Sequence, residues 1–217
     1  MPDPTDEPLD ELPAIRSTEV RRVRGTTTLW RLYSMVDHPL PWNAFRHWGP
    51  ASARWDPHPQ GEPREHRDRA VHYSATSIVT ALAEVFQQHR TIICAPGMRL
   101  VGYRLGRGVR MLDANGRWFT RAGASQSVVY GDPMRTQRWA AAITAANPDL
   151  DGIAYRSKLD PEQTCLALWF PAADALEQAA PLLDLPLDAP DLRGPIAAAA
   201  DRIGYDLEVG RPTVWEG

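Results

Sequence analysis

The first clear pattern of hydrophobic and polar positions is a strand-like alternation over residues 27–34. With a period of two residues, Leu29, Arg31 and Tyr33 fall on one face of this strand, and Trp30 and Leu32 fall on the other. Arginine is rarely buried in a core strand unless a partner holds it. The shared face of Arg31 and Tyr33 is therefore unusual for a strand with a purely structural role.

A second pattern, over residues 71–88, changes from a strand to a helix. Residues 71–73 carry branched and aromatic side chains, which suit a pleated surface, and a serine or threonine among residues 74–77 can cap a following helix. From residue 78 onward the apolar positions have helical spacing. Glu84 lies about 200° around this helix from the apolar residue Leu82. The pattern predicts a carboxylate in mid-helix, beside small and hydroxylated side chains and just after a strand that ends in Tyr73.

The rest of the chain is predicted to mix strands and helices. The spacing predicts strands at residues 91–95, 98–105, 109–112, 151–157, 162–170 and 205–209, and helices at 133–146, 172–180 and 192–203. A proline-rich linker is expected over residues 182–190. Because these elements follow one another without a regular βαβ rhythm, we expect an α+β fold rather than a doubly wound sheet.

The chain is expected to form one domain, residues 27–209, between an N-terminal tail (1–26) and a C-terminal tail (210–217). Residues 1–13 carry five acidic side chains and no basic one, which is typical of a disordered or loosely attached segment, and residues 16–24 are basic. A long connection over residues 35–70 has no clear elements, and connections of this length are more often functional than idle. Its charged second half is expected to be a solvated loop, with a substrate lid as the alternative.

Composition narrows the class of protein without naming an activity. Hydrophobic residues make up 43% and charged residues 24% of the 217 residues, as in ordinary globular proteins. The net charge of -3 lacks the basic excess of a nucleic-acid binder. Because we find neither a signal peptide nor an apolar run of about 18 residues, we expect a cytoplasmic protein with no membrane contact. Cys94 and Cys165 lie in apolar runs, which is typical of buried reduced thiols.

Several common catalytic and binding motifs are missing. The sequence contains no GxGxxG, no Walker loop, no HExxH and no CxxC. Its six histidines lack the spacing of metal ligands, so no metal site is expected. Ser157 does not sit in a G-x-S-x-G turn, which argues against a serine nucleophile.

Four segments together resemble the RES domain, the toxin of Res–Xre toxin–antitoxin modules. They are WRLY around Arg31, ARWDPHP around Arg54, HYSATSIVTALAEVF around Tyr73 and Glu84, and DGIAYRSKLDPEQTCLALWF around Ser157. The family is named for its arginine, glutamate and serine, and the resemblance covers residues 27–170 and extends less clearly to 209.

This sequence departs from the family pattern in three places. The link between residues 56 and 73 is longer than in compact members, and the acidic N-terminal segment is additional. Leu32 follows Arg31 where the family has an aromatic residue, which leaves open whether Tyr33 takes that place in the pocket.

The resemblance implies a fold similar to ADP-ribosyltransferases, with a central cleft between small β-sheets flanked by helices. It also implies an activity on NAD as substrate: cleavage of the nicotinamide–ribose bond with water or phosphate as acceptor, or transfer of ADP-ribose to a protein. A cognate Xre-type antitoxin and a homodimer are implied partners by the same resemblance, with no direct contact to nucleic acid by this chain.

The residue types suit that chemistry. Loss of nicotinamide leaves positive charge on the ribose, as in glycoside hydrolysis, and Glu84 would stabilise it. The guanidinium of Arg31, together with Arg54, matches the oxygens of a pyrophosphate. Tyr73 would stack on nicotinamide or bind the ribose, and Ser157 would position the substrate or orient Arg31. Two rival interpretations remain open, a protein ADP-ribosyltransferase and a binding protein that has the fold without catalysis.

Overall fold

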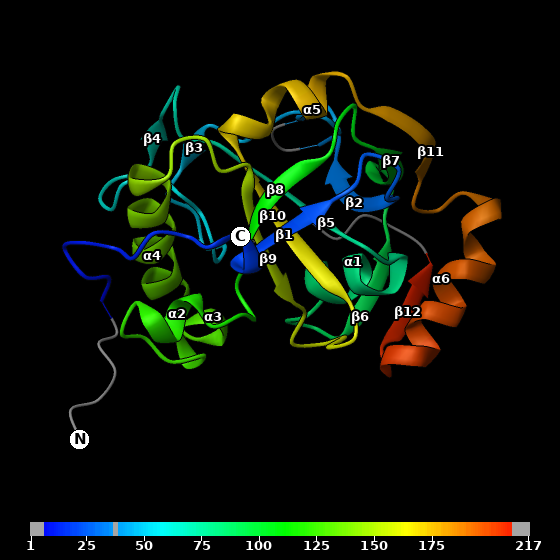
Figure 1. Ribbon diagram of the computed structural model, residues 1–217. Helices are drawn as coiled ribbons and strands as arrows, with labels where there is room; N and C mark the ends of the chain where they lie inside the picture. Colours follow the sequence, from blue (N-terminus) through cyan, green and yellow to red (C-terminus); the bar gives the residue numbers. More distant parts are fainter. Residues whose placement is uncertain (1–6, 37–38, 210–217) are drawn as a thin grey trace.

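The computed structural model describes residues 7–36 and 39–209, so the predicted C-terminal tail at 210–217 and residues 1–6 of the predicted N-terminal tail lie outside the described residues. Over the described ranges the chain forms an α+β fold, which confirms the predicted class (Figure 1). Its centre is an eight-stranded sheet in the order β1-β8-β9-β10-β5-β2-β7-β11. These strands are Val20–Val23 (β1), Val109–Asp113 (β8), Gly152–Arg156 (β9), Thr164–Trp169 (β10), Val71–Ala75 (β5), Leu29–Ser34 (β2), Met98–Arg104 (β7) and Ala180–Pro186 (β11).

The large sheet is nearly divided between β5 and β2. In the described chain these strands meet at one residue pair, Trp30 with Ala75. By contrast, β2 pairs with β7 at six positions and β5 pairs with β10 at five. The sheet is therefore two smaller sheets joined at a narrow seam, and this seam corresponds to the cleft expected between small sheets.

The helices lie in two groups on either side of the seam (Figure 1). One group is Trp118–Arg121 (α2), Ser127–Tyr130 (α3) and Pro133–Ala146 (α4), which share a hydrophobic cluster with β8, β9 and β10. The other is Ile78–Val85 (α1) and Pro190–Ile203 (α6), which pack on β2 and β7. A further helix, Ala173–Glu177 (α5), belongs to a cluster formed by the alternate side chains of the same strands, on the opposite face of the sheet. The sheet face that carries α1–α4 and α6 is thus covered by helices at both ends, and the seam lies between the two helix groups.

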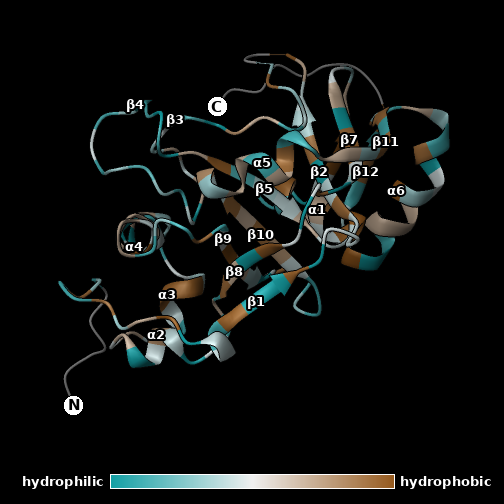
Figure 2. Cartoon of the chain, turned by 45° about the horizontal axis from the view of Figure 1, so that its top comes forward, coloured by the Kyte–Doolittle hydropathy of each residue, from teal (hydrophilic) through white to brown (hydrophobic). Residues whose placement is uncertain are grey.

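The smaller elements complete the described chain. Trp48–Gly49 (β3) pairs with Arg64–Glu65 (β4), and Thr91–Cys94 (β6) pairs in parallel with Asp206–Val209 (β12). Short 3-10 turns lie at Ser17–Glu19 and Phe170–Ala172. The loop that carries β3 and β4 is largely hydrophilic (Figure 2). Across the described ranges, every helix is too short or too polar to span a bilayer.

Two predictions about the chain's organisation are wrong. The N-terminal segment is built into the domain before residue 27: β1 pairs with β8, and the indole of Trp118 donates a hydrogen bond to the carbonyl of Pro13. Leu12 and Ile15 pack against the α2–α4 cluster, so the acidic composition of this segment concealed its apolar contacts. Residues 182–186 of the expected linker belong to strand β11, and an edge strand tolerates prolines because one of its edges needs no N–H donors.

Candidate active site

A cavity of about 760 Å³ lies over the seam, between the two groups of helices. Both strands of the seam, helix α1 and the start of α4 contribute side chains to its wall. Four of the residues singled out from the sequence line it, namely Arg31, Arg54, Tyr73 and Glu84. Strand, loop and helix residues from distant parts of the chain thus meet in one cavity.

Glu84 projects from α1, whose N-terminus is capped by Ser77 as the sequence predicted. Its Oε1 accepts a hydrogen bond of 2.7 Å from the Ser157 hydroxyl. The Ser157 oxygen in turn accepts from the backbone N–H groups of Leu159, at 3.0 Å, and Asp160, at 3.1 Å. From the sequence, Ser157 was expected to position the substrate or to orient Arg31. In the structure its hydroxyl contacts the carboxylate of Glu84 and not Arg31.

Arg54 brings positive charge to the same carboxylate. Its Nη2 lies 3.9 Å from Oε2 of Glu84, and both side chains are largely buried. The hydroxyl of Tyr73 donates a 2.6 Å hydrogen bond to the carbonyl oxygen of Arg54. This contact holds the backbone of the Arg54 loop against β5 and leaves the ring of Tyr73 in the cavity wall.

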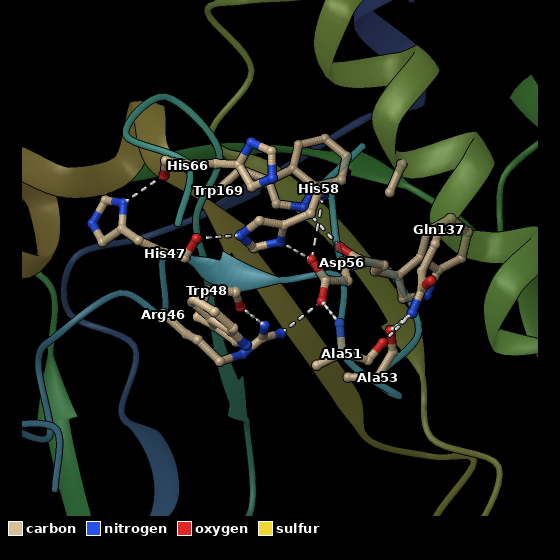
Figure 3. A network of polar contacts seen from close by, with 12 residues as sticks. Arg46, His47, Trp48, Ala51, Ala53, Asp56, His58, His66, Gln137 and Trp169 are labelled. Atoms are coloured by element: carbon tan, nitrogen blue, oxygen red, sulfur yellow. Dashed lines mark hydrogen bonds and ion pairs between the residues drawn. The ribbon is translucent and has the colours of Figure 1, made fainter. Parts of the chain in front are cut away.

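The loop that carries Arg54 is fixed by a buried polar network (Figure 3). The carboxylate of Asp56 accepts from Arg46, at 2.8 Å, and contacts the ring of His58. Burial would raise the pKa of Asp56, but the hydrogen bond from His58 and the charge of Arg46 lower it to about 2. On the α4 side, the amide of Gln137 donates to the carbonyl of Ala53 at 2.9 Å. The long connection is therefore an ordered wall of the cavity on its Arg54 side.

Arg31 is a guanidinium without a counter-charge. Its Nη1 donates to the backbone carbonyl of Tyr73 at 3.3 Å, and its Nε is buried without a hydrogen-bond partner. Among the described residues, no carboxylate forms an ion pair with it. Burial lowers the pKa of Arg31, yet an arginine side chain remains charged in proteins. The cavity wall thus holds a cation that lacks an anionic partner among these residues.

A chain of neutral groups lies behind Arg31. Burial holds the pKa of His72 well below its usual value, so its ring is neutral. Its Nδ1 faces the carbonyl of Ala44 at 3.1 Å and must carry the proton, so Nε2 accepts from the hydroxyl of Tyr103 at 2.9 Å. The oxygen of Tyr103 then accepts from Ser74. Burial also raises the pKa of Tyr103 to about 12, so these groups surround Arg31 with dipoles and no negative charge.

Comparison with known proteins identifies the family. The model of the RES domain matches residues 28–188, which is most of the chain. The chain belongs to the RES domain family. This RES domain also resembles a chain in the crystal structure of the M. tuberculosis MbcT–MbcA toxin–antitoxin complex, with a TM-score of 0.51 and 18% identity over 82% of this chain and 92% of that chain. No curated protein matches the sequence.

One residue predicted for the pocket of this RES domain lies elsewhere. The hydroxyl of Tyr33 donates to the carboxylate of Asp184 at 2.9 Å and accepts from Nε of Arg99 at 2.9 Å. Both partners lie on β7 and β11, on the side of β2 away from the seam. Tyr33 is not among the residues that line the cavity, so the structure gives no support to the pocket position that the sequence left open for it.

Other cavity residues of the RES domain were missed in the sequence. Tyr155 and Cys165 lie on β9 and β10 and line the cavity. Tyr155 is two residues before Ser157, so the period of a strand places it on the same face and offered a signal. Cys165 was interpreted only as a buried thiol, and both cysteines are buried and free of disulfide bonds as predicted. In the described part of the chain, we find no group of three or more side chains arranged as a metal site.

Proposed function

We propose that this protein is an NAD-consuming toxin of a toxin–antitoxin module, and that it cleaves the bond between nicotinamide and ribose. The observation that carries the proposal is that one cavity contains both an oriented carboxylate and an unpaired cation. The carboxylate is Glu84, and the cation is Arg31, which has no ion-pair partner among the described residues. Buried charges are normally paired, so an unpaired cation in a cavity wall favours an anionic ligand. The pyrophosphate of NAD supplies that charge.

Each side chain has a role in this reaction. Arg31 binds the pyrophosphate, and Arg54 adds positive charge close by. As the nicotinamide–ribose bond breaks, its electron pair leaves with nicotinamide, and the carboxylate of Glu84 stabilises the positive charge that develops on the ribose. Phosphate, or water that gives up a proton to the solvent, then bonds through oxygen to the ribose carbon, and the products are nicotinamide and ADP-ribose or its phosphate. Because the hydroxyl of Tyr73 is bound to the loop, its ring is the part that would stack on the substrate.

The antitoxin part of the proposal rests on family and fold. The RES family match supports a toxin, and the structural relative was crystallised as a toxin–antitoxin complex. We propose a cognate antitoxin for this chain, of the Xre type, which would suppress toxicity when the two are co-expressed. Co-expression with the protein encoded beside it, scored by cell growth, tests this part separately from the chemistry.

The decisive measurement is release of free nicotinamide from NAD by the purified protein, with and without phosphate, beside the variant Glu84→Gln. We expect the variant to lower kcat by about 100-fold or more and to change NAD affinity little, because Glu84 acts on charge that develops in the transition state. Glu177→Gln, an exposed glutamate on α5, is the matched control and should keep full activity.

Other outcomes would redirect the proposal. Dependence on phosphate would identify phosphate as the acceptor. Labelled protein in place of stoichiometric free product would favour a protein ADP-ribosyltransferase. Absence of both would refute the enzymatic role and leave a binding protein on the same fold.

A further inference from the structure

Helix α1 and the turn between β9 and β10 are joined by two hydrogen bonds of opposite direction. Thr80 and Glu84 are four residues apart and therefore adjacent on one side of the helix. The hydroxyl of Thr80 donates to Oδ2 of Asp160 at 2.7 Å, from the helix to the turn. The hydroxyl of Ser157 donates to Oε1 of Glu84 at 2.7 Å, from the turn to the helix.

The Thr80 hydroxyl donates because a carboxylate oxygen is the acceptor, and the direction of the Ser157 bond follows from the number of protons available. The Ser157 oxygen already accepts from two backbone N–H groups of the turn, so its single proton is directed to Glu84. One of those N–H groups belongs to Asp160. The same residue thus binds Ser157 through its backbone and Thr80 through its side chain, and it connects the two bonds.

These contacts are shielded from water. Thr80 is 0%, Ser157 is 1% and Asp160 is 7% exposed. A buried hydroxyl or carboxylate that loses its partner has no solvent to replace it, so the arrangement strongly favours a single geometry. The turn cannot shift along α1 without breaking at least one of the two bonds.

We infer that Thr80 and Asp160 are positioning residues for Glu84, which act through Ser157 to hold the carboxylate in its catalytic orientation. This inference rests on the proposed function. The turn fixes Oε1 of Glu84, and Oε2 then lies on the side of Arg54, at 3.9 Å. A carboxylate fixed through one oxygen presents the other in a defined direction to the positive charge that develops on the ribose.

The test is the steady-state kinetics of nicotinamide release by Thr80→Val and Asp160→Ala. Valine keeps the branched shape of threonine and has a methyl group in place of the hydroxyl. We expect kcat to fall by about 10- to 100-fold with KM within about twofold, because misplacement of a reacting group by a fraction of an ångström acts on the transition state. Thr80→Ser and Asp160→Asn, which keep a donor and an acceptor at these positions, should retain most of kcat.

Thr144→Val is the matched control. Thr144 is also buried, and its hydroxyl donates to the carbonyl of Ala140 within α4, away from the cavity. Both threonine-to-valine variants remove one buried hydrogen bond, and their thermal unfolding should be compared directly. Only Thr80→Val should lower kcat.

A double-mutant cycle with Glu84→Gln separates positioning from general stability. If Thr80 acts through Glu84, its substitution should change the residual activity of Glu84→Gln by less than about twofold. An equal loss in both backgrounds, or unchanged kcat in Thr80→Val beside an active wild type, would overturn the positioning role. A wild-type protein that releases no nicotinamide would instead refute the proposed function, and the positioning role with it.

Discussion

Replacement of Arg31 by methionine should make the protein more stable and weaken its binding of NAD. Arg31 is held by one 3.3 Å hydrogen bond to a backbone carbonyl, its Nε has no partner, and burial disfavours its charge. Methionine has a similar length and is apolar, so it can occupy the same space without the cost of desolvating a charge. Opposite effects on stability and binding are expected where a binding site keeps an unfavourable group.

The magnitudes follow from the geometry. Replacing buried ionic groups by apolar side chains of similar volume stabilises proteins by about 1–4 kcal/mol, and we expect the lower half of that range because Arg31 borders an open cavity. For a chain of this size, about 1–2 kcal/mol raises Tm by roughly 2–8 °C. Loss of a charged bidentate contact to phosphate costs about 2–4 kcal/mol, which weakens NAD binding by roughly 30- to 700-fold.

The assays are thermal unfolding without ligand and calorimetric titration with NAD, on Arg31→Met, the wild type and Arg104→Met. Arg104 is an exposed arginine at the end of β7, and its replacement should change stability by less than about 0.5 kcal/mol and leave binding unchanged. A decrease in Tm for Arg31→Met would show that the guanidinium stabilises the fold. Unchanged NAD affinity would remove Arg31 from the binding site.

Two further predictions concern groups beside the cavity. Ser157→Ala should lower kcat by more than about tenfold and the free energy of unfolding by about 2–3 kcal/mol, because it leaves two backbone N–H groups of the turn and the carboxylate of Glu84 without their partner. Ser127→Ala, at an exposed serine of α3, should do neither, and an active Ser157→Ala would contradict the role given to that hydroxyl. For His72, burial holds the folded-state pKa well below 6.5, so the unfolded chain binds a proton first as the pH falls. The contribution of His72 to the free energy of unfolding is therefore complete above about pH 6.5 and should decrease by up to about 1.4 kcal/mol per pH unit below it. The measurement is urea unfolding of the wild type and His72→Gln at several pH values. Identical pH slopes of the free energy of unfolding for the two proteins would refute this.

Local patterns predicted the central elements well because their signals are short in range. The alternation over residues 27–34 and the helical spacing after Ser77 correspond to β2 and α1. The N-terminal segment and β11 were predicted wrongly because the prediction relied on their acidic or proline-rich composition, whereas their structure depends on strand pairing with β8 and β7. A strand of four residues, or one that contains two prolines, is stabilised by its neighbour in the sheet, and no local pattern reports that neighbour.

The site was predictable as a set of residues but not as a geometry. Period-two alternation placed Arg31 and Tyr33 on one face of β2, and this is where the reasoning failed for Tyr33. A shared face does not imply a shared cavity, because the side chain of Arg31 bonds to β5 across the seam, whereas that of Tyr33 bonds to Asp184 and Arg99 on the other side of β2. The position of the seam depends on strand order, which is a long-range property.

The contact between Ser157 and Glu84 likewise could not be predicted from local sequence patterns, and the residues beside it explain how it is fixed. Seventy-three positions separate the two side chains, and only the packing of the β9–β10 turn on α1 brings them together. That packing requires specific polar contacts, because a hydrophobic contact alone would allow the turn to slide along the helix. Thr80 and Asp160 supply such contacts one helical turn away from Glu84. If the orientation of the carboxylate decides the rate, the residues that fix the turn should affect kcat almost as strongly as Ser157 itself.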